Sequence, residues 1–209
     1  MFLLFMFIIC CDLEGIFVPE IWIKLAEATG IDELKLTTRD EPDYDKLMKN
    51  RLKILREKHI TLKNIQKITE EMDLLTGAKE FMSWIRSVSQ VVVLTDNYEE
   101  FLNSLLKKLD YPLCFCHHLE TDEKGFISKY RLITKDMKRK AVQSFKNLNY
   151  DVIAVGDSYN DIKMLKEAKH GFLFRPPNNV KEEFPEFPVI NEYSEFRKLL
   201  ENHLGISEN

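Results

Sequence analysis

The sequence predicts an α/β protein in which a doubly wound parallel sheet forms the core and a small all-helical segment is inserted into it. Apolar runs of strand length alternate with amphipathic helical patterns along most of the chain, as in proteins that cover both faces of a parallel sheet with helices. Between residues 18 and 75, by contrast, only helical patterns occur. We therefore expect a core formed by residues 1–17 and 76–209 and a helical cap domain formed by residues 18–75.

The first strand is predicted at residues 3–10, an apolar run typical of a strand buried on both faces of a sheet. A helix follows from Pro19 and Glu20, and Gly30 is a typical C-terminal stop. After a polar connection at residues 36–44, two further helices are predicted, the second with Thr61 as its N-cap. The apolar stripes of these helices are Ile21, Trp22, Leu25 and Ala26; Met48, Leu52 and Leu55; and Leu62, Ile65, Ile68 and Met72.

The alternation of strands and helices resumes after residue 76. Strands are predicted at residues 91–94, 113–118, 151–155 and 171–174, and a hairpin between residues 120 and 132. The helical stripes between and after them are Ala78, Phe81, Ile85 and Val88; Phe101, Leu102, Leu105, Leu106 and Leu109; Ala141, Val142, Phe145 and Leu148; Ile162, Met164, Leu165 and Ala168; and Phe196, Leu199, Leu200 and Leu204.

The composition is that of a mildly acidic globular protein. Hydrophobic residues make up 44% of the 209 residues, enough for a full core. A net charge of -4 argues against a nucleic-acid surface, which needs clustered positive charge. The apolar residues 1–11 lack the basic start and cleavage site of a signal peptide, and they are far fewer than the roughly 20 that span a bilayer. We expect no nucleic-acid partner and no membrane contact.

The four cysteines, Cys10, Cys11, Cys114 and Cys116, do not have the spacing of a disulfide framework. They predict a reduced protein of the cytoplasm. Cys114 and Cys116 share a strand face with His118, but no second cluster supplies the remaining ligands of a zinc site. We therefore do not expect zinc.

Reactive side chains follow the carboxyl ends of three predicted strands. A doubly wound sheet brings such strand ends to one crevice, where these folds bind their ligands. Carboxylates gathered there repel one another unless a cation lies between them, and Mg²⁺ suits carboxylate oxygens. A lysine and a hydroxyl beside such a cluster suit a phosphoryl group. The residues are Asp12 and Glu14, Thr95, and Asp157 and Asp161, with Lys138 at a helix start.

Each of these residues also has an ordinary structural explanation. An aspartate after a strand is commonly a turn or helix-cap residue, and a lysine at a helix start is commonly solvated. Their order and their placement at three strand ends favour a functional site. Two lysines could serve it: Lys138 begins the apolar stripe of a helix, whereas Lys135 lies one turn earlier in a predicted loop. We favour Lys138.

These segments resemble, in order, the four motifs of the haloacid dehalogenase-like phosphohydrolases, and the resemblance covers essentially the whole chain. The motifs are Asp12-Leu13-Glu14-Gly15, Thr95 after an apolar strand, Lys138 at a helix start, and Gly156-Asp157-Ser158-Tyr159-Asn160-Asp161. Glu14 stands where the usual pattern has a second aspartate. This difference matches the branch of phosphoserine phosphatases that also act as phosphoserine:homoserine phosphotransferases, which residues 18–23, 37–40 and 42–45 also resemble.

The resemblance implies that Asp12 is a nucleophile that forms an aspartyl-phosphate. It implies that Glu14 protonates the leaving oxygen and then deprotonates the incoming water or alcohol. It also implies a Mg²⁺ ion bound by Asp12, the main-chain carbonyl of Glu14 and Asp157, with Asp161 in its outer sphere. The residues that would hold the phosphoryl oxygens are Thr95, Lys138 and Gly15.

Substrate recognition is expected in the helical cap. Phosphoserine carries a carboxylate, which Arg51 can bind bidentately, and an ammonium, which Glu20 can pair with. Both resemble residues that phosphoserine phosphatases use for this purpose, and Arg39 is a weaker candidate. Structural explanations exist for both: Arg51 as a solvated helix residue, and Glu20 as a favourable charge near a helix N-terminus.

We therefore expect a Mg²⁺-dependent phosphoserine phosphatase that acts on O-phospho-L-serine and also transfers its phosphoryl group to homoserine. Two other functions remain open: a phosphatase of the same fold for another small phosphate ester, such as a nucleotide or sugar phosphate, and a non-enzymatic phospho-acceptor module resembling response-regulator receivers. A receiver needs no cap over its acceptor aspartate, which argues against the second. The sequence does not determine the oligomeric state, and a homo-oligomer stays among the candidate assemblies.

Overall fold

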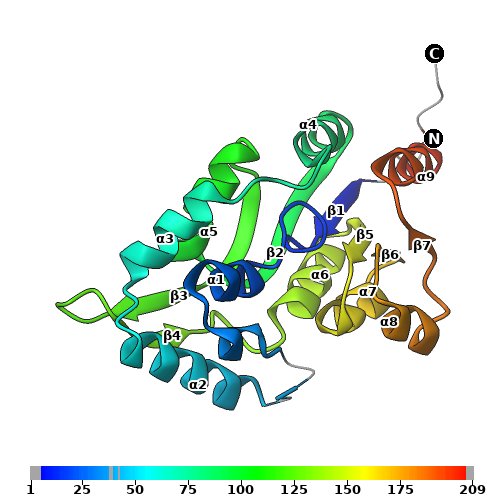
Figure 1. Cartoon of the computed structure of the whole chain (residues 1–209). Coiled ribbons are helices and arrows are strands. Elements are labelled where there is room, and N and C mark those ends of the chain that lie inside the picture. Colours follow the sequence, from blue (N-terminus) through cyan, green and yellow to red (C-terminus); the bar gives the residue numbers. More distant parts are fainter. Residues whose placement is uncertain (1–5, 38–39, 42, 206–209) are drawn as a thin grey trace.

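The computed structural model describes residues 6–37, 40–41 and 43–205, and the strands among them form one sheet (Figure 1). Its seven strands run in the order β4-β3-β2-β1-β5-β6-β7. Neighbouring strands are parallel, apart from the antiparallel pair β3 and β4 at one edge. This confirms the predicted α/β class. The strands are β1 (Phe7–Cys11), β2 (Gln90–Tyr98), β3 (Leu113–Thr121), β4 (Ile127–Arg131), β5 (Asp151–Gly156), β6 (His170–Phe174) and β7 (Val189–Ile190).

Strand β1 lies between β2 and β5 in the middle of the sheet. Its residues from Ile8 to Cys11 are buried, as expected of a strand covered on both faces. The predicted run begins at residue 3, but residues 3–5 lie outside the described part of the chain, and β1 begins at Phe7. The chain moves outward from β1 in both directions, so the ligand-binding crevice of such a sheet lies at the carboxyl end of β1.

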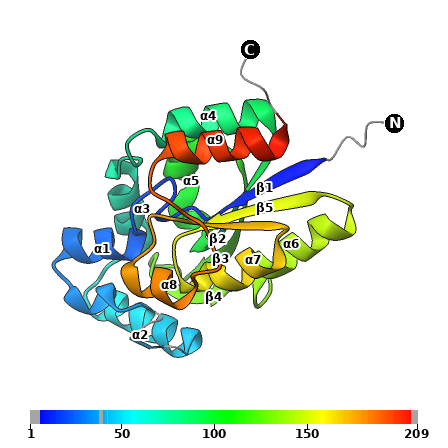
Figure 2. The same ribbon diagram turned by 90° about the vertical axis from the view of Figure 1, so that its right-hand side faces the viewer.

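Helices cover both faces of the sheet (Figure 2). In that view α4 and α9 lie above it, and α6 and α7 lie below. Successive side chains of β1 point to opposite faces, so Ile9 and Cys11 join one apolar cluster. Ile8 and Cys10 join the other. The helices of these layers are α4 (Ala78–Val88), α5 (Glu99–Lys108), α6 (Met137–Asn147), α7 (Ile162–Glu167), α8 (Asn178–Glu183) and α9 (Tyr193–Leu204).

The inserted segment lies at the end of the sheet where β1 terminates (Figure 2). It consists of α1 (Ile21–Thr29), the 3-10 helix η1 (Asp32–Lys35), α2 (Tyr44–Glu57) and α3 (Leu62–Glu71). Gly30 closes α1 with a φ of 68°, and the Thr61 side chain caps α3, which confirms both predicted boundaries. Apart from Leu47, the buried apolar side chains of this segment belong to the same cluster as those of α4, α5 and α9. The helical insertion is therefore packed directly on the core.

Some details differ from the sequence-based expectation. Strand β7 and helix α8 were not predicted. Strand β7 has only two residues, and the six residues of α8 include one buried apolar side chain, Val180, which forms no stripe. Leu148 was expected to point inward, and that prediction is wrong: it is 63% exposed. Helix α6 ends at Asn147, so the helical period no longer directs Leu148 towards the core.

Two expectations about the environment of the chain can be compared with the structure. All four cysteine thiols are free, and those of Cys10 and Cys11 are buried in β1. Within the described ranges, no helix combines the length and apolar composition needed to cross a bilayer.

Candidate active site

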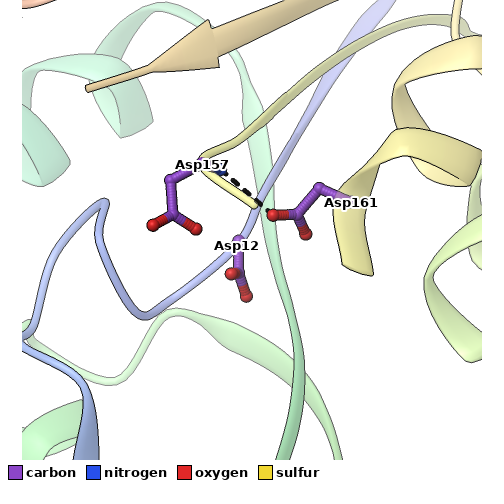
Figure 3. A group of neighbouring side chains, drawn as sticks. All are labelled: Asp12, Asp157 and Asp161. Atoms are coloured by element: carbon purple, nitrogen blue, oxygen red, sulfur yellow. Dashed lines mark hydrogen bonds between the residues drawn. The ribbon is translucent and has the colours of Figure 1, made fainter. Parts of the chain in front are cut away.

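The candidate site begins where β1 ends. Asp12 directly follows the strand, and its amide donates a hydrogen bond of 2.9 Å to the Val155 carbonyl of β5. The Asp12 side chain is almost fully buried. Because β1 and β5 run in parallel register, Asp157, which follows β5, emerges at the same edge of the sheet. Asp161 joins them from the 3-10 helix η2 (Tyr159–Asp161), as Figure 3 shows.

A buried lysine links two of these carboxylates. Lys138, in the first turn of α6, has its Nζ atom 2.8 Å from Oδ1 of Asp12 and 2.8 Å from Oδ1 of Asp161. Burial by itself lowers the pKa of a lysine, but these carboxylates outweigh it and hold the pKa of Lys138 well above its usual value. Lys138 is therefore a permanent positive charge at the centre of the site. Lys135, the other lysine considered, is exposed and lines a neighbouring cavity that shares Asp96 and Tyr159 with the cavity described below.

The second carboxylate oxygen of Asp161 is held by the loop that follows β5. Oδ2 accepts hydrogen bonds from the amides of Asp157 (3.0 Å) and Ser158 (3.1 Å) and from the Ser158 hydroxyl (3.3 Å). Gly156 allows Asp161 to approach, since a Cβ atom there would lie 2.3 Å from the Cβ of Asp161. Both oxygens of Asp161 are thus engaged within the protein.

Gly15 makes a similar close approach to Asp157. Its φ is +69°, and a Cβ atom built on it would lie 2.3 Å from Oδ2 of Asp157. Glycine is therefore required both by the backbone conformation and by the space beside the carboxylate. The Gly15 amide donates a 2.9 Å hydrogen bond to the Val18 carbonyl, so it is engaged in the loop, and phosphate binding by Gly15 stays a prediction.

The three aspartates Asp12, Asp157 and Asp161 bring carboxylate oxygens within 4.8 Å of one another. Burial raises the pKa of Asp12, the Asp161 carboxylate adds to the rise, and Lys138 offsets it only in part. A cluster of hard oxygen ligands with excess negative charge fits a divalent cation such as Mg²⁺. The Glu14 side chain is not part of this cluster. The metal-binding role expected of Glu14 rests on its main-chain carbonyl and stays a prediction.

The Glu14 carboxyl is held between two donors. Oε1 accepts a 2.6 Å hydrogen bond from the amide of Ile21, the first residue of α1, and Oε2 accepts a 2.6 Å hydrogen bond from Nδ2 of Asn97. Burial raises the pKa of Glu14 to about 8, and the Glu20 carboxylate adds to the rise against the effect of both hydrogen bonds. A carboxyl with this pKa is protonated at neutral pH, as a general acid must be.

The carboxyl end of β2 forms the other side of the site. Its register with β3 shifts between residues 94 and 98, a bulge of the kind that re-aims side chains. Thr95 is buried here, and its hydroxyl accepts a 3.2 Å hydrogen bond from the amide of Asn97. A carboxylate oxygen of Asp96 lies 3.8 Å from Nζ of Lys138.

A cavity of about 180 Å³ opens beside these groups and extends to the inserted helices. Both residues expected to recognise a substrate, Glu20 and Arg51, line it. The lining thus combines groups from the sheet edge with groups from the insertion. From the sheet edge and its loops it includes Glu14, Asp96, Asn97, Ser158, Tyr159 and Asn160, and from the insertion Trp22, Ile23, Lys35, Thr37, Tyr44 and Leu47.

Arg51 is only 6% exposed, so it is not the solvated arginine of the alternative explanation. Its guanidinium lies over the ring of Trp22, 4.2 Å from the centroid, and Nη2 donates a 2.7 Å hydrogen bond to the Leu36 carbonyl. Its Nε atom is buried without a hydrogen-bond partner among the described residues. Arg51 also lines the cavity, and a guanidinium there suits an anionic group. Arg39, the weaker candidate, lies outside the described residues.

The site residues that sequence reasoning missed include Asn97 and Trp22. Asn97 lies two positions after Thr95, and only the Thr95 hydroxyl of this segment was assigned to the site. Trp22 was assigned to a buried helix stripe, which is correct, but its ring also supports Arg51. A polar residue close behind a functional strand end was the available signal for Asn97. None was available for the pairing of Trp22 and Arg51, which depends on how α1 and α2 pack.

A carboxylate cluster and a buried lysine lie at the carboxyl end of β1, where the strand order of the sheet reverses. This arrangement is typical of α/β enzymes that bind an anionic substrate group. The family model of the haloacid dehalogenase-like hydrolases matches residues 12–169, and the chain belongs to this family. This confirms the resemblance drawn from the four motifs and the expectation of an enzyme.

Two curated relatives are similar over most of their length. The chain is 51% identical to phosphoserine phosphatase ThrH of Pseudomonas aeruginosa, over 91% of this chain and 93% of that protein. It is 50% identical to a phosphoserine phosphatase of Pseudomonas syringae pv. tomato, over 91% of this chain and 81% of that protein.

Solved structures agree in fold. A phospho-aspartyl intermediate analogue of phosphoserine phosphatase matches with a TM-score of 0.76 at 17% identity, over 93% of this chain and 99% of that chain. A substrate-bound phosphoserine phosphatase complex matches with a TM-score of 0.70 at 19% identity, over 93% of this chain and 97% of that chain. At these identities the matches confirm the fold alone.

Proposed function

We propose that this protein is a Mg²⁺-dependent phosphoserine phosphatase that works through an aspartyl-phosphate on Asp12. The observation that carries the proposal is the buried Arg51, which lines a small cavity together with Glu20 and Glu14. A guanidinium and a carboxylate on the same small cavity suit an amino acid with a free carboxylate and ammonium. Two relatives of about half identity named phosphoserine phosphatase support the same substrate.

In the proposed reaction an Asp12 carboxylate oxygen attacks the phosphorus. A bond forms between this oxygen and phosphorus, the bond from phosphorus to the serine oxygen breaks, and the electron pair goes to the serine oxygen. Oδ1 of Asp12 is bonded to Lys138, which leaves Oδ2 for the attack. The ammonium of Lys138 also offsets the charge of the phosphoryl group. Thr95 would contribute its hydroxyl to a phosphoryl oxygen.

Glu14 would transfer its carboxyl proton to the departing serine oxygen. It would then remove a proton from water, whose oxygen attacks the phosphorus and restores the Asp12 carboxylate. The raised pKa of Glu14, about 8, supports the first step because the acid is protonated before the reaction begins. Homoserine could take the place of water, since an alcohol and water both lose one proton to the same base. We include this transfer in the proposal.

A bound Mg²⁺ ion would neutralise the phosphoryl oxygens and keep Asp12 ionised. The residues proposed to hold it are Asp12, Asp157 and the main-chain carbonyl of Glu14. Asp161 would act in the outer sphere, because both of its oxygens are bonded to the protein.

We also propose that residues 18–75 act as a cap over the site, that the protein works in the cytoplasm, and that self-association into a homo-oligomer is compatible with this function.

The test is phosphate release from O-phospho-L-serine by the purified protein, with Mg²⁺ and with EDTA, and with or without homoserine. We expect release that needs Mg²⁺, and phosphohomoserine as an additional product when homoserine is present. Release without transfer would remove the homoserine part of the proposal. Turnover of an aryl phosphate but not of phosphoserine would contradict the substrate and leave the chemistry intact.

A further inference from the structure

The bulge at the end of β2 directs one amide side chain into the active site. Asn97 is only 3% exposed, and its main-chain amide donates a 3.2 Å hydrogen bond to the Thr95 hydroxyl. Its Nδ2 atom donates a 2.6 Å hydrogen bond to Oε2 of Glu14. The main chain of Asn97 is therefore bonded to the Thr95 hydroxyl of β2, and its side chain is bonded to the Glu14 carboxyl, which follows β1.

The other oxygen of this carboxyl is also anchored. Oε1 of Glu14 accepts a hydrogen bond from the Ile21 amide at the start of α1. A glutamate has one more rotatable bond than an aspartate, so fixing it in a single orientation costs more conformational entropy. A donor on each oxygen offsets that cost and leaves the carboxyl with one preferred orientation. Of the two donors, only Asn97 belongs to the core sheet.

We propose that Asn97 is a positioning residue that holds Glu14 in the orientation needed to protonate a leaving oxygen. The inference rests on the proposed function in one respect: it assumes that Glu14 is the general acid. Asn97 donates through Nδ2 and does not itself exchange a proton with the substrate. Its effect should therefore depend on how strongly the leaving group needs a proton, and not on which substrate the enzyme uses in the cell.

The test compares two aryl phosphates that differ in the leaving group. Nitrophenolate departs readily without a proton, whereas phenolate benefits from one. We expect Asn97→Ala to lower kcat/KM for phenyl phosphate by about 10- to 100-fold, part of the effect of a general acid. It should lower kcat/KM for p-nitrophenyl phosphate by no more than about threefold. An equal loss for both substrates would overturn the proposal, because a merely structural defect cannot distinguish leaving groups.

Asn97→Asp separates the donor from the packing. Aspartate has nearly the shape of asparagine, but when ionised it has no N–H to donate to Glu14. We expect Asn97→Asp to be at least as defective towards phenyl phosphate as Asn97→Ala. Full activity of Asn97→Asp would show that shape alone matters and would contradict the proposal. Asn103→Asp, the same charge change at an exposed position of α5, is the control and should behave like the unaltered protein.

A double-mutant cycle tests whether Asn97 acts through Glu14. In a Glu14→Gln background there is no acid to orient, so adding Asn97→Ala should change kcat/KM for phenyl phosphate by less than about twofold. Multiplicative losses would overturn the inference. None of these measurements needs phosphoserine turnover, so a different physiological substrate would refute the proposed function and leave the role of Asn97 standing.

Discussion

The Nζ atom of Lys138 lies 2.8 Å from Oδ1 of Asp12, and both side chains are buried at the switch point of the sheet. The contact joins the end of β1 to the first turn of α6, two elements separated by more than half of the chain. It makes the two residues depend on one another. Without the lysine, Asp12 and Asp161 would be buried as two uncompensated carboxylates, and without Asp12 the lysine would lose one of its two closest partners.

Replacing Lys138 should therefore affect both activity and stability. We expect Lys138→Met to lower turnover of any phosphate ester by about 100-fold or more and to destabilise the fold by about 3–5 kcal/mol. Phosphate release and chemical denaturation measure the two effects. Lys135→Met is the matched control, since Lys135 is exposed, and it should change neither by much. The reverse pattern would assign the phosphate-binding role to Lys135.

Gly30 is a matched control for a substitution of Gly15. Both have positive φ, +69° and +68°, but only Gly15 would bring a Cβ atom against Asp157, whereas the space beside Gly30 is open. Alanine at either position should cost about 1–2 kcal/mol in backbone strain. Only Gly15→Ala should also displace the Asp157 carboxylate and raise the Mg²⁺ concentration needed for half-maximal activity. Equal Mg²⁺ dependence in the two variants would argue against Asp157 as a metal ligand.

The stability of the protein without added divalent cations should fall as the pH rises towards 8. Glu14 has a pKa of about 8 in the folded state against the usual 4.5, because it is buried beside Glu20. Between these values the folded protein binds more protons than the unfolded chain, so its stability decreases with increasing pH. Denaturant titrations at pH 5 and pH 8.5 measure the change. Burial also raises the pKa of Asp12, which contributes in the same direction. Glu14→Gln should therefore reduce this dependence without abolishing it, and an unchanged slope in that variant would show that Glu14 does not contribute.

Arg51 and Glu20 should act on substrate binding more than on chemistry. A lost charge-assisted hydrogen bond at a buried position corresponds to about 10- to 100-fold in affinity. We expect Arg51→Lys and Glu20→Gln to raise KM for O-phospho-L-serine by this order, with little change for p-nitrophenyl phosphate. Steady-state kinetics on both substrates measures it. A parallel loss on the aryl phosphate would indicate a structural role for the residue instead.

Much of the fold was predictable because its signals are local. Buried parallel strands are short apolar runs, and helix ends such as Gly30 and Thr61 depend on a few neighbouring residues. Where the expectation and the structure differ, the local signal was misleading or absent. Leu148 continues an apolar period one residue beyond the end of its helix, and the two-residue strand β7 has no period at all.

Some residues of the candidate site were likewise predictable from local sequence, and others were not. The order of Asp12, Thr95, Lys138 and Asp157 along the chain, each at a strand or helix end, was sufficient to predict one shared crevice and a family. Sequence alone could not tell whether Arg51 is solvated or buried, since an arginine on an amphipathic helix can be either. That depends on α1 packing beside α2, which brings the Trp22 ring to 4.2 Å from the guanidinium.

The sequence by itself thus determined the fold class, the family and the positions of the reactive groups, because strand ends and their polar residues are encoded in short, contiguous segments. Only the tertiary structure decided how these groups constrain one another: Lys138 between Asp12 and Asp161, Gly15 against Asp157, and Asn97 bonded to Glu14. Contacts between segments far apart in the chain depend on register, on the bulge in β2 and on helix packing. Distances of a few ångströms set the charge of each carboxyl, and they arise only when the chain is folded.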